Sequence, residues 1–199
     1  MSVKLFSKLA AAALLAAGLA GCIDVNIDVA ITSPSTAKAT MTQVMSADVY
    51  SMVKMSAESG QEQDDSFCAE GELTENGDGS ATCIITEEGN FADLDLGQDE
   101  GGMTFTEAGP GLVRVALPTA DMQAELGGED DMDEQTRQMV EAFFEGRTMT
   151  IGISGAEIVE TNMTISDDKT RAEQVIDMLA LINGDAGLPD ELFAVVRAP

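Results

Sequence analysis

The 199-residue chain contains no histidine and no tryptophan, and it has one tyrosine and seven phenylalanines. Without histidine, Ser-His-Asp and Cys-His nucleophilic sites are excluded, as are imidazole acid–base catalysis and the usual zinc and iron ligand sets. Aromatic residues make up 4% of the chain, which leaves few rings for sugars or nucleic-acid bases to stack on. The sequence therefore predicts no catalytic residue, no metal ligand and no cofactor.

Basic residues are also scarce. Ten Lys and Arg face 36 Asp and Glu, which gives a formal net charge of −26. Such a surface repels nucleic acid and anionic lipid headgroups, so we expect no nucleic-acid partner. Apolar residues nevertheless make up 44% of the chain and recur periodically, which predicts a folded core and not a disordered acidic chain.

The first residues have the pattern of an export signal. Lys4 and Lys8 precede an uncharged apolar stretch over residues 9–19, which is too short for the about 20 residues that a bilayer core requires. The stretch ends in Leu19-Ala20-Gly21-Cys22, which resembles the bacterial lipobox. The resemblance implies a diacylglyceryl group on Cys22, cleavage before it and acylation of the new amino group, for example with palmitate. Several acyl chains give stable anchoring where one chain gives marginal binding.

An ordinary secretory signal with a chance cysteine is the alternative interpretation of this segment. We predict that residues 1–21 are a removed lipoprotein signal peptide and that residues 22–199 form a single lipid-anchored domain. Cys22 is followed by Ile23 and not by aspartate. This favours the periplasmic side of the outer membrane. The mature chain then has 178 residues and a formal charge of −28, because Lys4 and Lys8 leave with the signal.

Two cysteines remain once Cys22 is assigned to lipid. Export places Cys68 and Cys83 in an oxidising compartment, where a disulfide closing this loop would contribute about 3 kcal/mol. A redox pair usually has Cys-x-x-Cys spacing, and a thiolate metal site needs further Cys or His ligands. The sequence therefore favours a structural disulfide.

The periodicity of apolar residues predicts the elements. Alternation predicts strands at residues 23–32, 38–44, 81–86, 103–106, 112–117, 149–153, 158–165 and 192–197, and helical spacing predicts helices at 47–57, 119–126 and 131–146. Residues 68–87 are predicted to form a hairpin around Asn76-Gly77-Asp78-Gly79. Residues 90–96 fit a short helix or a turn, and 170–182 fit either a helix or a third strand of a meander. The predicted fold class is α+β: an antiparallel sheet with a few short helices packed on it and one disulfide.

Three segments resemble the LppM-type lipoprotein domain, a family of exported bacterial lipoproteins of poorly known function. They are the strand Ile23-Asp24-Val25-Asn26-Ile27-Asp28-Val29 after the lipidated cysteine, the stretch from Thr148 to Ile158, and the turn region from Asn162 to Arg171. The resemblance spans about half of the mature chain. It implies an α+β fold, a strand at residues 170–176 and a short helix at 177–182. It supplies no catalytic residue.

Several residue groups partly match the motifs of known sites. Ser51 and Lys54 form a Ser-x-x-Lys pattern, but the companion motifs of the penicillin-binding enzymes are missing. Gly152-Ile153-Ser154-Gly155-Ala156 lacks the final glycine of a nucleophile elbow. The stretch from Asn76 to Glu87 and the acidic run at residues 129–134 are candidates for calcium, yet a turn and a solvated loop explain them better. The paired methionines at 41 and 45 and at 52 and 55 are expected to fill the core and not to bind copper.

These observations predict an envelope lipoprotein, attached to the membrane through its lipid, that acts as a non-enzymatic binding or structural protein. Its partner would be a protein or an amphiphile. The 36 acidic residues leave one alternative open, an envelope hydrolase that uses carboxylates alone. Asp24 and Asp28, on the polar side of the first strand, are the carboxylates expected to become buried if a helix covers that side.

Overall fold

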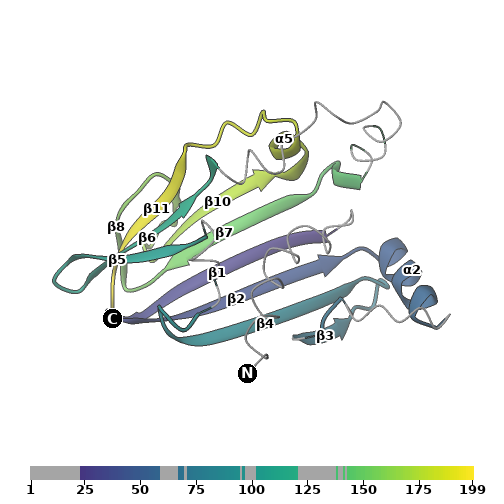
Figure 1. The fold of residues 1–199 in the computed structure, drawn as a ribbon, viewed down its shortest axis with the longest axis horizontal. Coiled ribbons are helices and arrows are strands. Elements are labelled where there is room, and N and C mark those ends of the chain that lie inside the picture. The colour runs from purple at the N-terminus through teal and green to yellow at the C-terminus, as the bar shows by residue number, and fades with distance from the viewer. Residues whose placement is uncertain are drawn as a thin grey trace, which may run out of the picture.

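The fold was analysed in a computed structural model, which describes residues 23–58, 67–69, 71–94, 96, 102–120, 138, 141 and 143–199. Strands dominate the described residues (Figure 1). The elements are β1 (Ile23–Ser33), β2 (Thr36–Met45), α2 (Ala47–Glu58), β3 (Glu72–Glu75), β4 (Ala81–Asn90), β5 (Thr104–Gly109), β6 (Leu112–Pro118), β7 (Thr148–Ser154), β8 (Glu157–Thr161), β9 (Thr164–Ile165), β10 (Arg171–Asp177), α5 (Met178–Ile182) and β11 (Glu191–Arg197).

The largest sheet has seven strands in the order β3-β4-β2-β1-β7-β10-β9. β1 and β2 form the predicted antiparallel hairpin, in which Ile23 is opposite Met45. β7, however, pairs with β1 in parallel, with Val25 opposite Met149. The predicted antiparallel sheet is therefore wrong in one respect, because this sheet is mixed. A parallel pair needs a long crossover connection, and more than 100 residues of chain separate β1 from β7.

A second sheet has four strands in the order β5-β6-β11-β8. It corrects the prediction for residues 158–165, which was a single strand returning in a meander after residues 149–153. That stretch divides into β8, which pairs with β11 in the second sheet, and β9, which pairs with β10 in the first. The sequence pattern is alternating throughout, but Asn162 and Met163 form a bend that carries the chain from one sheet to the other.

The ambiguous residues 170–182 form a strand followed by a short helix. β10 pairs antiparallel with β7, and Asp177 caps α5 by accepting a hydrogen bond from the backbone N–H of Ala180 at 2.8 Å. The chain is richer in strand than the predicted α+β class, and the helices described over their full length are α2 and α5, short segments beside two extended sheets. The described residues 138, 141, 143 and 144 of the helix predicted at 131–146 are also helical. The helix predicted at 47–57 is confirmed as α2.

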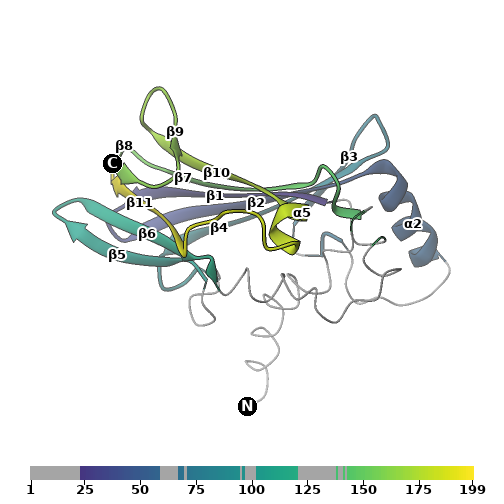
Figure 2. The same ribbon diagram turned by 90° about the horizontal axis from the view of Figure 1, so that it is seen from above.

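The core lies between the two sheets. Alternate residues of β1, β7 and β10 point to this inner face, and most of them are buried, among them Val29, Ile31, Ile151, Ile153, Ala172 and Ile176. The four-stranded sheet contributes Val113, Val115, Ala194 and Val196 from the other side. Figure 2 shows the four-stranded sheet and α5 on the same side of the large sheet. The other side, called here the outer face, carries no described helix or strand.

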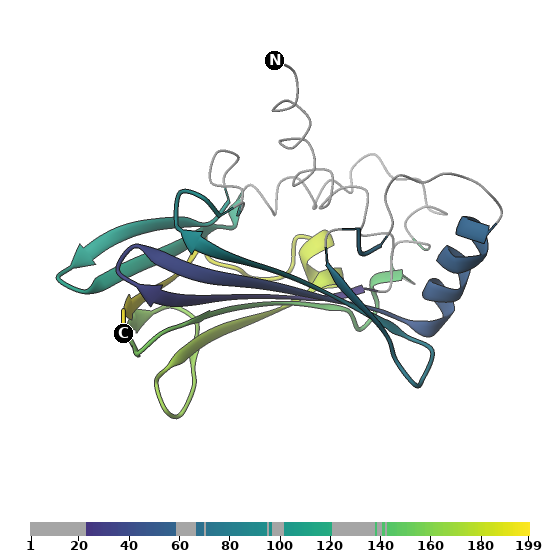
Figure 3. The same cartoon turned by 90° about the horizontal axis from the view of Figure 1, so that it is seen from below.

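One end of the large sheet is defined by α2 and is called here the α2 end. β1 begins there at Ile23, β2 ends there at Met45, and α2 starts two residues later. A second apolar cluster joins α2 to the sheet, in which Tyr50 packs with Val25, Met45 and Ala81. In Figures 2 and 3, α2 lies across this end with its axis steeply inclined to the strands.

The cysteine hairpin forms as predicted. Cys68 and Cys83 are bonded, with a Cα–Cα distance of 5.5 Å, and the bond ties the segment before β3 to the middle of the β3–β4 hairpin. Gly71 passes so close to this bridge that an added Cβ would lie 2.7 Å from the Cys83 sulfur and 2.8 Å from the Ile84 carbonyl oxygen. The hairpin therefore requires glycine at position 71.

Other predictions fall outside the described residues. Most of the helix predicted at 119–126 and most of that at 131–146 lie there, as do the acidic run at 129–134 and residues 1–22. Residues 91–94 form a turn, which decides between the two options for that segment. Among the described residues, no helix combines the length and the hydrophobicity that crossing a membrane demands.

Candidate functional site

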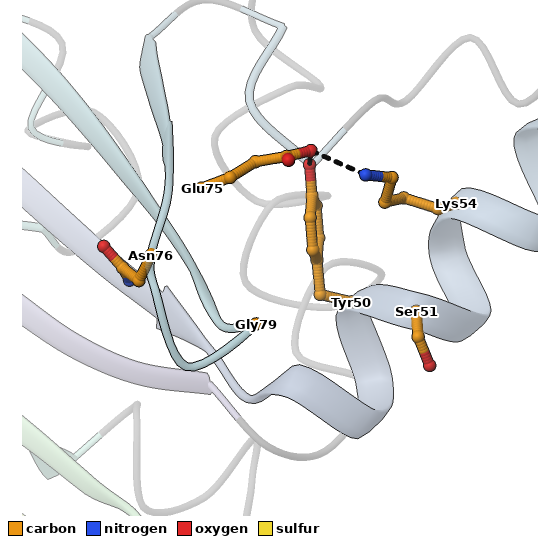
Figure 4. A pocket seen from close by; sticks show the side chains of 6 residues that line it. All are labelled: Tyr50, Ser51, Lys54, Glu75, Asn76 and Gly79. Carbon is orange, nitrogen blue, oxygen red and sulfur yellow. Dashed lines mark hydrogen bonds and ion pairs between the residues drawn. The ribbon is translucent and has the colours of Figure 1, made fainter.

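Ser51 and Lys54 line one hollow at the α2 end, but they do not form a serine–lysine dyad. The Ser51 hydroxyl donates to the backbone oxygen of Asp48 at 2.8 Å, and the Lys54 ammonium donates to the carboxylate of Glu75, also at 2.8 Å. Figure 4 shows Ser51 pointing away from Lys54. A hydroxyl committed to a helix carbonyl, and a lysine held by a carboxylate, leave no base beside a nucleophile.

The hollow has a volume of about 340 Å³ and is lined by Tyr50, Ser51, Lys54, Glu75, Asn76 and Gly79. Its centre is one carboxylate oxygen, Glu75 Oε1, which accepts a hydrogen bond from Lys54 and another from the Tyr50 hydroxyl at 2.8 Å (Figure 4). The Lys54 ammonium also lies 5.4 Å from the centre of the Tyr50 ring. The three side chains form one interacting group that joins α2 to β3.

The electrostatics of this group favour fixed protonation states. The hydrogen bond from Lys54, followed by that from Tyr50, lowers the pKa of Glu75 below its usual value. The hydrogen bond to Glu75 and partial burial raise the pKa of Tyr50. Near neutral pH the carboxylate is ionised and the phenol is protonated, so neither group is a suitable proton-transfer catalyst. The hollow is a structural junction and offers no evident reaction chemistry.

Asp24 and Asp28 lie on the outer face, where no described helix covers them, so the conditional expectation of burial is not met. Asp28 pairs with Arg171 of β10, and Asp24 accepts hydrogen bonds from Arg147 at 3.4 Å and from the backbone N–H of Thr148 at 3.0 Å. Both carboxylates are about one-third exposed or more. Each is therefore neutralised by an arginine from another part of the chain.

The Asp28–Arg171 pair reaches across an intervening strand. Asp28 of β1 is opposite Gly152 of β7, and Gly152 is opposite Glu173 of β10. A Cβ on Gly152 would overlap the Arg171 guanidinium and the Asp28 carboxylate, so the missing side chain provides the path for the arginine. Arg171 also donates to Glu173 through Nε at 3.2 Å and Nη2 at 3.1 Å. The sequence pattern gave no sign of this network, because its members are far apart in the chain.

The outer face surrounding this network is mostly polar over the central strands. Its polar side chains are Asp24, Asn26, Asp28, Thr40, Thr42, Thr148, Thr150, Arg171 and Glu173, with Gly152 among them. Two exposed apolar side chains belong to the same face: Val175, opposite Thr150, and Ile84, opposite Thr42. Asn26 lies at its centre, donates to Asp28 at 3.0 Å, and has a side-chain oxygen that is buried and without a partner among the described residues. Hydroxyl, amide, carboxylate and guanidinium groups thus share one rigid surface, which is able to form hydrogen bonds with a partner.

The candidate calcium loop at residues 76–87 is a hairpin turn. The Asp78 carboxylate accepts hydrogen bonds from the Ser80 backbone and hydroxyl, and these bonds lower its pKa. Asn76 donates to the hydroxyls of Ser80 and Thr82. The oxygens that a calcium ion would need are used to close the turn. Within the part of the chain that the structure describes, no cluster of three or more Cys, Asp or Glu side chains is placed to hold a metal.

The methionine prediction is only partly correct. Met45 is buried, at 5% exposure, and Met41 packs beside it. Met52 and Met55, expected in the core, instead lie on the outward side of α2, where they are 50% and 62% exposed. The reason is that Tyr50 and Val53 supply the packed side of α2, which turns residues 52 and 55 away from the sheet.

Cys22, the predicted lipidation residue, lies just before the described residues, and the chain enters β1 at Ile23. No family profile matches the chain, and no curated protein matches it in sequence. Among solved structures, the chain is similar to the folded domain of LppM from Mycobacterium tuberculosis, determined by NMR. The TM-score is 0.47 and the identity is 14%, over 89% of this chain and 91% of that one.

Proposed function

We propose that this protein is a lipid-anchored domain of the bacterial cell envelope that acts by binding another protein and not by catalysis. The observation that carries the proposal is the position of β1. Its first residue, Ile23, directly follows the lipobox cysteine, and its polar side forms the middle of an open, hydrogen-bonding face. A lipid on Cys22 would therefore hold this face close to the membrane without a long tether.

The chemistry of the outer face favours a protein as its partner. The face has no aromatic ring of the kind on which sugars and bases stack, and the charge of the chain opposes nucleic acid. A long apolar groove would favour an amphiphile, whereas the exposed apolar side chains of this face, Val175 on β10 and Ile84 on β4, are separated by three strands and lie among hydroxyl and charged groups. Polar groups held in place around a few arginines suit a protein interface, because hydrogen bonds to them would fix how the partner is aligned.

The alternative of a carboxylate-based hydrolase gains no support. Such enzymes use two carboxyl groups about 5–10 Å apart, one of them kept protonated by burial or by a second negative charge. Among the described residues, no Asp or Glu side chain is buried. Asp24 and Asp28, the two carboxylates expected to serve, are each paired with an arginine.

The anchor is tested by mass spectrometry and phase partition. We expect the mature wild-type protein to begin at a Cys22 that carries a diacylglyceryl group, and to enter the detergent phase. Cys22→Ser should stay unlipidated and partition into water. Cys68→Ser is the control, because it removes a cysteine without touching the lipobox, and it should still partition with detergent. An unmodified Cys22, or cleavage at another position, would contradict the anchor.

The binding face is tested by photo-crosslinking in intact cells. A photoreactive residue at Thr150, in the centre of the outer face, is compared with one at Val159 of β8, a 47% exposed position in the other sheet. We expect a discrete protein adduct from position 150, none from position 159, and loss of the adduct with Arg171→Glu. Equal adducts from both positions, or adducts with lipid only, would overturn the assignment of the outer face.

A further inference from the structure

The outward side of α2 carries two exposed methionines, at the end of the sheet where the lipid anchor is proposed. Met52 and Met55 lie three residues apart, hence on one side of the helix, and are 50% and 62% exposed. On the opposite side, Tyr50 is buried against Val25 and Met45. α2 therefore has one apolar side that the sheet covers, and on its outward side Met52 and Met55 lie exposed beside Asp48 and Ser51.

The position of α2 in the fold brings its outward side close to the proposed membrane. Ile23 is opposite Met45, α2 starts at Ala47, and the Cα of Cys22 is about 3.8 Å from that of Ile23. α2 lies across the α2 end of the sheet, steeply inclined to the strands (Figures 2 and 3). A bilayer that holds the lipid of Cys22 at this end would run along the helix, which is the orientation of an interfacial helix.

The charged residues at the α2 end indicate which headgroup charge the lipid surface would have. Its two described cations, Lys54 and Arg147, are engaged by Glu75 and Asp24. Asp48 lies on the outward side of α2 near Met52 and Met55. Anionic headgroups would find no unpaired cation among these residues and would meet carboxylates. The contact is therefore hydrophobic and suits a zwitterionic surface.

We propose that α2 rests in the interface of the bilayer that holds the Cys22 lipid, with Met52 and Met55 inserted below the headgroups. The proposal rests on the anchoring proposed above. It gives the domain a second point of attachment, which fixes its orientation. The strands then extend away from the membrane, and the outer face lies at a steep angle to the membrane surface.

The experiment exploits the absence of tryptophan from the chain, which makes a single introduced tryptophan a reporter without background. Met52→Trp, Met55→Trp and the control Val159→Trp are each purified as the lipidated protein and placed in phosphatidylcholine vesicles, with or without brominated acyl chains. We expect the tryptophan emission at positions 52 and 55 to be blue-shifted, and its intensity to fall by roughly half in brominated vesicles. The tryptophan at position 159 should lose less than about a tenth of its emission intensity in the same vesicles.

Flotation of the same vesicles separates the two proposals. In one outcome the protein floats with the vesicles, but the emission shift and quenching at positions 52 and 55 equal those at position 159. This result overturns the helix contact and leaves the anchor intact. Protein that stays in the aqueous fraction overturns the anchor and the contact with it. A blue shift without bromine quenching means that protein, and not lipid, covers α2, which also overturns the contact.

Discussion

At the scale of single residues, Gly152 determines how the outer face is built. In a central strand, glycine usually weakens packing, by about 0.5–1 kcal/mol relative to alanine. Here its lack of a side chain lets Arg171 cross β7 to reach Asp28. The effect of a substitution at position 152 thus combines a gain in strand propensity with the loss of an ion pair.

A double-mutant cycle separates these two effects. Asp28→Asn should lower the free energy of unfolding by about 1 kcal/mol in the wild-type chain, because it weakens a half-buried ion pair. In the Gly152→Ala background the same change should cost almost nothing, since the Cβ has already displaced Arg171. Urea unfolding measures both. Asp24→Asn is the control, and its cost should be the same in the two backgrounds. Equal costs for Asp28→Asn in both would show that Arg171 does not need position 152.

Tyr50 offers a second test, because it is the only tyrosine of the chain. Its hydrogen bond to Glu75 raises its pKa above the usual value of 10.0 for tyrosine. The bond's contribution to stability is therefore complete below pH 10 and is lost as the pH rises through the higher folded-state pKa. Ultraviolet titration of the tyrosinate band should give a midpoint above 10 in the wild type and a lower one in Glu75→Gln. Glu72→Gln, on the same strand, should leave it unchanged.

At the scale of elements, the β3–β4 hairpin depends on its disulfide. β3 is short and all its side chains are exposed, so little apolar burial holds it in place. We expect Cys68→Ser with Cys83→Ser to lower the free energy of unfolding by about 3 kcal/mol, the value for a loop of this length. Chemical denaturation measures the loss. Labelling of the denatured, unreduced wild-type protein should find neither thiol free, and labelling of both would contradict the bond.

A substitution at Gly71 tests how tightly the same hairpin is packed. A methyl group at this position meets the Ile84 carbonyl oxygen at 2.8 Å, and this backbone atom is unable to move without disturbing β4. Gly71→Ala should therefore lower stability by about 1–3 kcal/mol. Gly77→Ala is a matched control, because nothing lies within 4 Å of its added Cβ. Similar melting temperatures for the two variants would show that the segment before β3 relaxes freely.

At the scale of the whole molecule, the charge of the chain is the dominant feature. The chain carries a formal charge of −26, and repulsion among its carboxylates opposes the compact state. Salt screens this repulsion, with a Debye length of about 10 Å at 0.1 M. The melting temperature should therefore rise as sodium chloride increases from about 10 mM to about 0.5 M. A melting temperature that falls with salt would mean that attractive ion pairs, such as Asp28–Arg171, outweigh the repulsion.

The sequence by itself determined the local elements and the pairing of cysteines. Alternation located β1, β2 and β7, helical spacing located α2, and parity left Cys68 and Cys83 for one bond. These features depend on residues that are neighbours in the chain or on simple counting. The lipobox at Cys22 is likewise read from adjacent residues, and it stays a prediction because Cys22 lies outside the described residues.

Only the tertiary structure decided how these elements are placed. The parallel pairing of β7 with β1, the division of residues 157–165 between two sheets and the Asp28–Gly152–Arg171 arrangement all join segments that are distant in the chain. The exposure of Met52 and Met55 was missed for the same reason. Periodicity shows that a helix has an apolar side, whereas which side meets the sheet depends on the competing burial of Tyr50 against β1 and β2.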